Sequence, residues 1–357
     1  MSDLSLEVTL GADGAVFVKA NAKGALSFRF SFGENAVFNN TSGEIEYIYK
    51  LNGSHTLGVW AFFDEQQTAY SYETVAVDIK NASGGTLQNP DQGFIDDSEQ
   101  ATAYSGYTLV WNDEFNYKGA PLDSRWHLQY IPIFGGGWAN DERQHYTNRR
   151  DNSIVGDGTL KIIAKKENYT YSGSQKQYTS ARLNSKFHFQ YGRVDVKAKL
   201  PASAGTWPAI WTLGSNVNEV GNYFGDQYGN VGWPACGEID IMEHTGTDKS
   251  KVQGHFHWAD TQTGEYGSYG EQKSLADLGI SDLSSDFHVY SLIWNKSSLQ
   301  ILIDDQLIVQ LSNTVNIPFD NPHYILLNLA MGGTLGGNIP ADFEQARMEI
   351  DYVRIYQ

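Results

Sequence analysis

The chain has 357 residues, enough for two domains, and its 41% hydrophobic and 19% charged residues are typical of a globular protein. Its formal net charge of −17 argues against a nucleic acid or an anionic membrane as partner, because either would need a basic surface. The single cysteine, Cys236, excludes an intrachain disulfide, and no apolar run is long enough to predict a membrane span.

The first 80 residues predict a small β-sandwich module. Strand candidates recur at intervals of roughly ten residues, separated by turn signals such as Asn52-Gly53. These candidates are Leu6–Leu10, Ala15–Ala20, Leu26–Phe32, Ile45–Lys50, His55–Phe63 and Thr74–Ile79. Residues 27–34 and 47–56 resemble the immunoglobulin-like PKD (polycystic kidney disease) module. That resemblance implies a spacer or docking unit, with independent carbohydrate binding as the alternative.

An acidic linker is expected at residues 81–103. This segment has four acidic residues, no basic ones, three glycines and one proline, with little apolar periodicity. Such a composition is typical of an exposed segment between domains. The sequence therefore predicts a module at 1–80, a flexible linker at 81–103 and a larger domain at 104–357.

Alternation of apolar and polar residues continues through the larger domain. Gly192–Leu200, for example, places a polar residue at every second position, as a half-buried strand does. The opening segment is Leu109–Phe115, and the other candidates are Gly158–Ala164, Trp207–Leu213, Gly237–His244, Lys251–Trp258, His288–Trp294, Leu299–Ile303, His323–Met331 and Met348–Tyr356. About ten strands with few helical patterns predict an all-β fold, a single antiparallel jelly-roll sandwich.

Three carboxylates stand close together in one of these strand candidates, Gly237–His244. Strand side chains alternate between faces, so Glu238 and Asp240 share one face and the isoleucines that follow them share the other. Glu243 is out of phase and would point with the isoleucines in a regular strand. A β-bulge at Ile241-Met242 would return Glu243 to the face of the other acids, and bulges are frequent beside active sites.

Neighbouring carboxyl groups suit glycoside hydrolysis, which needs one ionised nucleophile and one protonated acid across the scissile bond. Repulsion among three acids raises at least one pKa, which keeps a proton available near neutral pH. From the residues alone, a calcium site and a solvated polar face remain as alternatives. Calcium usually also takes loop carbonyls and asparagine, and the tryptophans nearby favour a substrate cleft over a solvated face.

The segment Gly232–His244 closely resembles the active-site signature of family 16 glycoside hydrolases. Its Glu-x-Asp-x-x-Glu spacing is similar to that of the bacterial laminarinases, which are endo-1,3-β-glucanases. The resemblance covers residues 107–357, with ordered matches that include Trp111–Phe115, Asn140–Thr147, Tyr178–Leu183, Thr206–Trp211, Asn328–Gly333 and Asp351–Gln357. It implies a concanavalin A-like jelly roll and a retaining double displacement, with Glu238 as nucleophile, Asp240 as its helper and Glu243 as acid/base.

Several substrate-binding residues are expected around these acids. Trp207 and Trp211 are four residues apart and share a strand face that predicts a cleft floor, and Trp138 on its glycine-rich loop is expected at the rim. The family resemblance implies five more positions, Trp233 on the glycone side, Asn140, Glu142, Arg182, and His257 close to the acid/base. The alternatives are core packing for each tryptophan and a surface ion pair for the arginine or glutamate. A zinc site at His255 and His257 is a further alternative, although no third zinc ligand has suitable spacing.

A structural calcium ion is a further implication of the resemblance, since the family often binds one away from the cleft. The matching ligands are the backbone carbonyls of Glu114 and Gly158 and the carboxylate of Asp351. An oxygen-only set suits Ca²⁺. The alternative is that Asp351 only forms a salt bridge.

The leading prediction is an endo-acting hydrolase of β-1,3-glucan (laminarin), with mixed β-1,3/1,4-glucan as a further substrate. The alternatives are a hydrolase of a galactan such as agarose, a transglycosylase, and a non-catalytic glucan-binding protein, although such binding proteins typically lose the carboxylates present here. We expect a monomer that is secreted or lies at the cell surface or in the periplasm of a bacterium. Residues 1–3 begin no signal peptide, so the export signal is expected to be absent from this sequence.

Overall fold

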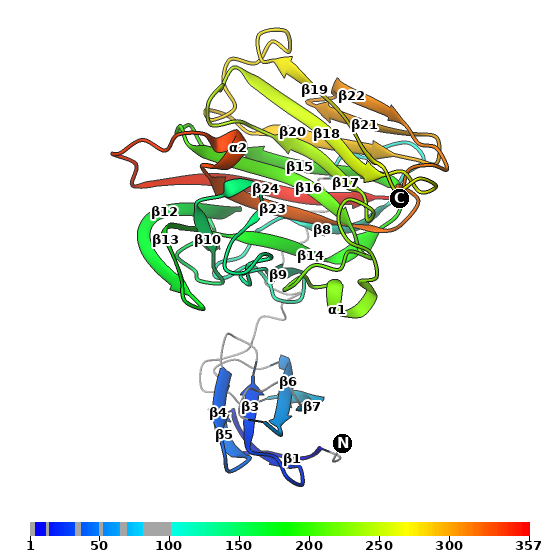
Figure 1. Cartoon of the computed structure of the whole chain (residues 1–357). Helices are drawn as coiled ribbons and strands as arrows, with labels where there is room; N and C mark the ends of the chain where they lie inside the picture. The colour runs from blue at the N-terminus through cyan, green and yellow to red at the C-terminus, as the bar shows by residue number, and fades with distance from the viewer. Residues whose placement is uncertain (1–3, 12–13, 33–36, 50–52, 65–69, 81–100) are drawn as a thin grey trace. The chain divides into compact units, whose positions relative to one another are not determined.

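The computed structural model describes residues 4–11, 14–32, 37–49, 53–64, 70–80 and 101–357. The chain divides into two compact units, Met1–Gly93 and Phe94–Gln357 (Figure 1). Most of the predicted linker, residues 81–100, lies outside the described residues, as does Lys50, the predicted end of one strand.

The first unit is a sandwich of two antiparallel sheets, as the alternating sequence predicts. One sheet has the order β1-β2-β5 and the other the order β4-β3-β6-β7. Inward-facing residues of both sheets, such as Val18, Phe30 and Val59, share one core. The prediction misses β4, a short strand that ends in two asparagines. The strands are β1 (Ser5–Leu10), β2 (Ala15–Asn21), β3 (Ser27–Ser31), β4 (Val37–Asn40), β5 (Glu44–Ile48), β6 (Gly53–Phe62) and β7 (Tyr70–Ile79).

The second unit is a jelly-roll sandwich, in which a 10-stranded sheet forms one layer. Its strands follow the order β10-β13-β12-β24-β15-β20-β21-β22, with β11 paired to β12 and β8 paired to β24. These strands are β8 (Leu109–Asp113), β10 (Gln144–Tyr146), β11 (Ser153–Gly156), β12 (Thr159–Tyr171), β13 (Ser174–Ser180), β15 (Gly192–Lys199), β20 (His288–Trp294), β21 (Ser298–Ile303), β22 (Gln306–Ser312) and β24 (Gln345–Tyr356).

A 7-stranded sheet forms the other layer, in the order β19-β18-β17-β16-β23-β14-β9. Figure 1 shows these strands stacked in that order, from β19 at the top to β9 near the bottom of the unit. They are β9 (Trp126–Leu128), β14 (Arg182–Phe189), β16 (Thr206–Gly214), β17 (Glu238–Glu243), β18 (Lys251–Ala259), β19 (Tyr266–Ser274) and β23 (His323–Met331). We call this layer the cleft sheet, because the cavity described below opens on its outer face.

The sequence predicts the all-β fold correctly but underestimates the number of strands. Missed strands such as β13 (SQKQYTS) and β19 (YGSYGEQKS) consist mainly of polar residues and glycine. The last strand of a sheet buries few of its side chains, so β19 carries no apolar alternation that could reveal it. One pairing, between β10 and β13, is parallel rather than antiparallel as expected.

Alternation along the strands divides the side chains of the cleft sheet between two environments. Ile239 and Leu327 point inward and share one continuous core with Val196 and Ile350 of the other sheet. Their sequence neighbours therefore point to the opposite, open face. The described helices, η2 (Ala139–Asp141), α1 (Gly225–Tyr228) and α2 (Gly333–Gly336), are about one turn each, and none could cross a bilayer.

Candidate active site

A bulge in β17 brings three carboxylates to the open face of the cleft sheet. Trp211 of β16 pairs with Asp240, whereas Ile210 pairs with Met242, so Ile241 is the extra residue. The pairing of β17 with β18 shifts at the same place, between Asp240 and Glu243. Ile241 and Met242 are buried in the core. The predicted bulge is therefore confirmed, and Glu243 faces the same way as the other acids.

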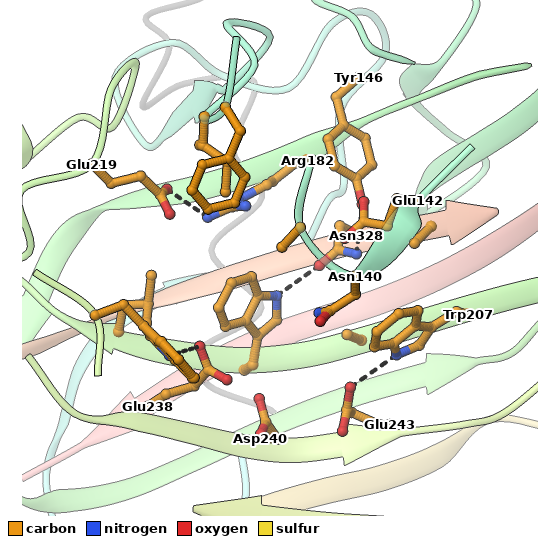
Figure 2. Close-up of a pocket in the computed structure, with 18 residues that line it drawn as sticks. Asn140, Glu142, Tyr146, Arg182, Trp207, Glu219, Glu238, Asp240, Glu243 and Asn328 are labelled. Carbon is orange, nitrogen blue, oxygen red and sulfur yellow. Dashed lines mark hydrogen bonds and ion pairs between the residues drawn. The ribbon is translucent and has the colours of Figure 1, made fainter. Parts of the chain in front are cut away.

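The carboxylates line a cavity of about 360 Å³ on the cleft sheet. This volume lies within the range of small-molecule binding sites. Figure 2 shows Glu238, Asp240 and Glu243 in a row along β17, with the polar residues of β23 and β14 facing them across β16. The wall also includes Trp207, Trp211, Trp233, Asn140, Glu142, Arg182, Glu219, Asn328 and Phe134.

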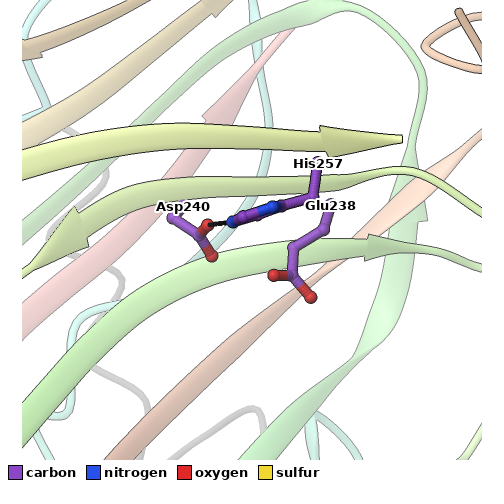
Figure 3. A group of neighbouring side chains, drawn as sticks. All are labelled: Glu238, Asp240 and His257. Carbon is purple, nitrogen blue, oxygen red and sulfur yellow. Dashed lines mark ion pairs between the residues drawn. The ribbon is translucent and has the colours of Figure 1, made fainter. Parts of the chain in front are cut away.

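Glu238 and Asp240 lie close together beside His257. Carboxylate oxygens of both, together with a ring nitrogen of His257, lie within 4.8 Å of one another (Figure 3). The Trp233 indole N–H donates to Oε2 of Glu238 at 3.1 Å. Asp240 is 4% exposed. Among the described residues its only polar partner is His257, whose Nε2 lies 3.5 Å from Oδ2. Glu238 therefore has a donor that favours its ionised form, and Asp240 has almost none.

Glu243 is held by a donor on each carboxylate oxygen. The Trp207 indole N–H donates to Oε1 at 2.8 Å, and the Gln253 amide donates to Oε2 at 2.9 Å. Gln253, the pairing partner of Glu243 on β18, in turn accepts from the Gln272 amide at 2.7 Å. This chain of contacts fixes the direction in which Glu243 presents its carboxyl group to the cavity.

Burial and mutual repulsion raise the pKa of each of the three acids. Burial, followed by the charge of Glu243, raises the pKa of Glu238 to about 8, and the Trp233 N–H partly offsets this rise. Burial and both glutamates raise the pKa of Asp240 well above its ordinary value. Burial raises the pKa of Glu243, while Gln253 and Trp207 lower it. The cluster therefore retains at least one proton near neutral pH, as general acid catalysis requires.

We expect Asp240→Asn to stabilise the protein at pH 8 but not at pH 4. The folded-state pKa values of these acids lie above the unfolded ones, so the folded state binds more protons, and stability is lost as pH rises towards the folded values. An asparagine cannot ionise, so it avoids this loss. Thermal unfolding of both proteins between pH 4 and pH 8 measures the effect, with the exposed Asp342→Asn as control. A stability difference independent of pH would contradict the assignment.

The tryptophans of β16 form part of the cavity wall, as their spacing predicts. Trp207, Ala209, Trp211 and Leu213 all line the cavity, which is the period-2 face of the strand. The Trp211 indole N–H donates to the Asn328 side-chain oxygen at 2.6 Å. Both indole N–H groups are thus bonded to protein, which leaves the apolar ring surfaces to contact a ligand.

A further carboxylate, Glu142, is tied into this network from the far side of the cavity. The Asn328 amide donates to the Tyr146 hydroxyl at 3.0 Å, and that hydroxyl donates to Oε2 of Glu142 at 2.9 Å. The Gln144 amide also donates to Oε2, at 2.6 Å. Oε1 of Glu142 has no side-chain partner among the described residues. It is therefore available to accept a hydrogen bond from a hydroxyl group of a ligand in the cavity.

Arg182 and Glu219 form a buried ion pair in the same wall. Their side chains are 6% and 15% exposed, and Nη2 lies 2.7 Å from Oε1. The guanidinium also lies over the Trp211 ring, 4.8 Å from its centroid. Gln129 donates to the same carboxylate at 2.8 Å. Glu219 belongs to the long β16–β17 connection, so this pair fastens that connection to β14.

Two sequence-based expectations about individual site residues are wrong. Trp138 does not lie at the rim, because it is buried behind the wall with its ring 4.6 Å from that of Tyr146. Instead Phe134, on the same loop, is 63% exposed and lines the cavity. His257 pairs with Glu238 and contacts Asp240, so it lies beside these acids rather than beside Glu243.

The three expected calcium ligands come from neighbouring chain segments. Val353 pairs with Asp113 and Ile350 with Leu160, so Asp351 lies between the end of β8 and the hairpin turn at Gly158. The Glu114 side chain is bound bidentately by Arg354, which leaves its backbone carbonyl for a cation. Lys197 is 2.7 Å from Oδ2 of Asp351. The oxygen donors fit calcium, but the carboxylate already has one cationic partner.

Comparison with known proteins identifies relatives of the second unit. Residues 140–354 match the family described as Glycosyl hydrolases family 16. The chain is 35% identical over 274 residues to the Beta-glucanase of Rhodothermus marinus, covering 73% of this chain and 88% of that protein. It is also 35% identical to the Glucan endo-1,3-beta-glucosidase of Cryptopygus antarcticus, covering 71% and 93%.

A solved structure gives the same result at higher identity. A LamA variant from Zobellia galactanivorans, crystallised with laminaritriose and laminaritetraose, is 58% identical and has a TM-score of 0.68. The match covers 71% of this chain and 100% of that one. The family match, residues 140–354, contains the bulged strand β17.

Proposed function

Because the chain belongs to family 16 of the glycosyl hydrolases, and is therefore a glycoside hydrolase, we propose that its second unit cleaves β-1,3-glucan chains internally, with retention. The observation that carries this proposal is the bulged β17, which directs Glu238, Asp240 and Glu243 into one tryptophan-lined cavity. Relatives named for endo-1,3-glucosidase activity, and one crystallised with laminarin oligosaccharides, support the choice of glucan.

The proposed reaction is a double displacement. Glu238 reacts in the form of the cluster in which it is ionised, accepting from the Trp233 N–H, while Asp240 and Glu243 carry protons. It attacks the anomeric carbon while Glu243 donates its proton to the departing glycosidic oxygen. This step breaks the glycosidic bond and forms a glycosyl ester on Glu238. Glu243, now ionised and held by Trp207 and Gln253, then takes a proton from water, which attacks the same carbon and releases Glu238. Two inversions give overall retention.

Asp240 is proposed to keep the charges of the two glutamates apart. It lies between them in sequence and is almost fully buried, and burial together with both glutamates raises its pKa well above the ordinary value, which favours the protonated state. A neutral Asp240 adds no second negative charge beside Glu238 when Glu238 must be ionised. This role explains why a third acid is present where the reaction itself needs two.

Reducing-end assays on four polymers test the proposed function. We expect cleavage of laminarin, weaker cleavage of mixed-linkage lichenan, and none of agarose or κ-carrageenan. A neutral glucan suits this chain because its net charge of −17 disfavours a sulfated polymer. Cleavage of agarose without cleavage of laminarin would replace the glucan by a galactan, and binding of laminarin without cleavage would indicate a glucan-binding protein.

We also propose that calcium binds at Asp351, Glu114 and Gly158. Among the described residues, Oδ1 of Asp351 has no hydrogen bond, so it can contact a cation while Oδ2 faces Lys197. Saturating Ca²⁺ is expected to raise the melting temperature by about 5 °C or more over EDTA, since a ligand at 100 times its Kd adds about 2.7 kcal/mol. Asp351→Asn should lose this shift and Asp342→Asn should keep it. Equal melting temperatures in Ca²⁺ and EDTA would exclude the site.

The first unit is proposed to be a PKD-like spacer or docking module. Its two-sheet sandwich and the segments 27–34 and 47–56 support this assignment. We further propose that the enzyme is a monomer. We also propose that it works outside the cytoplasm, because its polymeric substrate is a large extracellular molecule. Light scattering of the purified chain and fractionation of the producing cells test these two points.

A further inference from the structure

Tyr266 stands at the edge of the candidate active site, and no sequence pattern singles it out. It begins β19, the last strand of the cleft sheet, and its side chain is 57% exposed. Tyr266 pairs with Ala259, and His257 pairs with Ser268, so Tyr266 and His257 are diagonal neighbours across the ladder. A tyrosine is long enough to span this diagonal on one sheet face.

The Tyr266 hydroxyl contacts one nitrogen of His257, and the other nitrogen faces the acids. The hydroxyl oxygen lies 2.7 Å from Nδ1. On the other side of the ring, Nε2 lies 3.5 Å from Oδ2 of Asp240 (Figure 3). Burial lowers the pKa of His257 to about 4, so the ring is neutral at neutral pH and carries a single N–H. Which nitrogen holds that hydrogen decides whether the ring can donate to Asp240.

The His257 ring has little freedom to turn. It stacks on His255 with ring centroids 4.3 Å apart and the planes 14° apart. His255 fits there because its strand partner is Gly270, where a Cβ atom would lie 2.2 Å from Nδ1 of His255. The Tyr266 ring is also nearly parallel to the His257 ring, with the ring centroids 6.0 Å apart and the planes 20° apart.

We propose that Tyr266 is a positioning residue for the acid cluster, whose hydroxyl donates to Nδ1 of His257 and so fixes the tautomer with Nε2–H directed at Asp240. The Nε2–H then attracts the Asp240 carboxyl group, which lies within 4.8 Å of Glu238, and limits its rotation. Glu238 keeps its Trp233 donor and stays free to attack the anomeric carbon. This inference rests on the proposed function.

The Tyr266 ring has a second, separable contact. Its centroid lies 5.9 Å from the ring of Trp233, which is 52% exposed, so the two rings together form an apolar surface beside Glu238. Removing the hydroxyl alone therefore tests the tautomer, whereas removing the whole ring also removes part of a surface for sugar.

Steady-state kinetics on laminarin with Tyr266→Phe tests the proposal. We expect kcat to fall about 3- to 10-fold, the range for one net hydrogen bond, with KM unchanged because the ring remains. Tyr266→Ala should lower kcat similarly and also raise KM. In a His257→Gln background, Tyr266→Phe should have no further effect, because the hydroxyl acts through the imidazole. Tyr269→Phe is the matched control, since Tyr269 is an exposed tyrosine of the same strand whose hydroxyl donates to Glu271 at 3.2 Å.

Nitrogen-15 NMR of histidine-labelled protein gives a direct readout. The His257 signals, identified by their loss in His257→Gln, should show protonated Nε2 in the wild type and a shift towards protonated Nδ1 in Tyr266→Phe. Wild-type kcat in Tyr266→Phe, or an unchanged tautomer, would overturn the inference while leaving the proposed function intact. A wild-type enzyme that does not cleave laminarin would instead contradict the proposed function.

Discussion

Glu238→Ala is expected to lower kcat on laminarin on the order of 10³-fold or more, which corresponds to an increase of about 4 kcal/mol in the activation free energy. The side chain forms the covalent bond to the sugar in the proposed reaction, and none of the neighbouring groups can replace it. Glu238 is also fixed by Trp233 at the cavity wall, so its loss removes the nucleophile without removing core packing. Reducing-end assays with long incubations measure the residual rate.

Added azide separates the roles of the two glutamates. In Glu238→Ala, azide can occupy the vacated space and attack the anomeric carbon directly, so an α-glycosyl azide is expected from a single inversion. In Glu243→Ala, azide attacks the ester on Glu238, and a β-glycosyl azide is expected. Glu271→Gln, at an exposed glutamate of β19, should leave the activity unchanged. Interchanged products would reverse the assigned roles.

Glu219→Gln is expected to destabilise the second unit by about 3–5 kcal/mol. The substitution leaves the buried Arg182 guanidinium without its counter-charge, although the side chain keeps nearly the same volume. For a unit of this size the melting temperature should fall by roughly 6–20 °C. Differential scanning calorimetry of the full chain measures the change.

The exposed pair Lys273–Glu271 provides the comparison. Its side chains are 35% and 42% exposed, against 6% and 15% for Arg182 and Glu219. Screening by water keeps such pairs below about 1 kcal/mol, so Glu271→Gln should change the melting temperature little. Equal effects of the two substitutions would show that burial does not set the strength of the Arg182–Glu219 pair.

The parts of the site that follow from local periodicity were predictable from the sequence. Glu238, Asp240 and Glu243 lie on one strand, so their spacing alone reveals the bulge that unites them. Trp207 and Trp211 likewise share a face because they are an even number of residues apart. The two-sheet architecture follows from the same alternation, repeated along the chain.

The parts that depend on contacts between distant strands were not predictable. Asn328 bonds to Tyr146, 182 positions away, and Arg182 pairs with Glu219, 37 positions away. Nothing in the local pattern around Glu219 distinguishes it from a surface acid, because its burial is created by the β16–β17 connection. Trp138 shows the reverse error, since a glycine-rich loop suggests exposure, whereas packing on Tyr146 buries the ring.

The anomeric form of the first product tests the central claim most directly. Proton NMR during the first minutes of laminarin hydrolysis, before mutarotation, distinguishes the two anomers of the new reducing end. The proposed double displacement predicts that oligosaccharides of several lengths appear first as the β-anomer and that Glu238→Ala abolishes the signal. Initial release of the α-anomer, or equal rates in wild type and Glu238→Ala, would contradict the roles assigned to the three acids of β17.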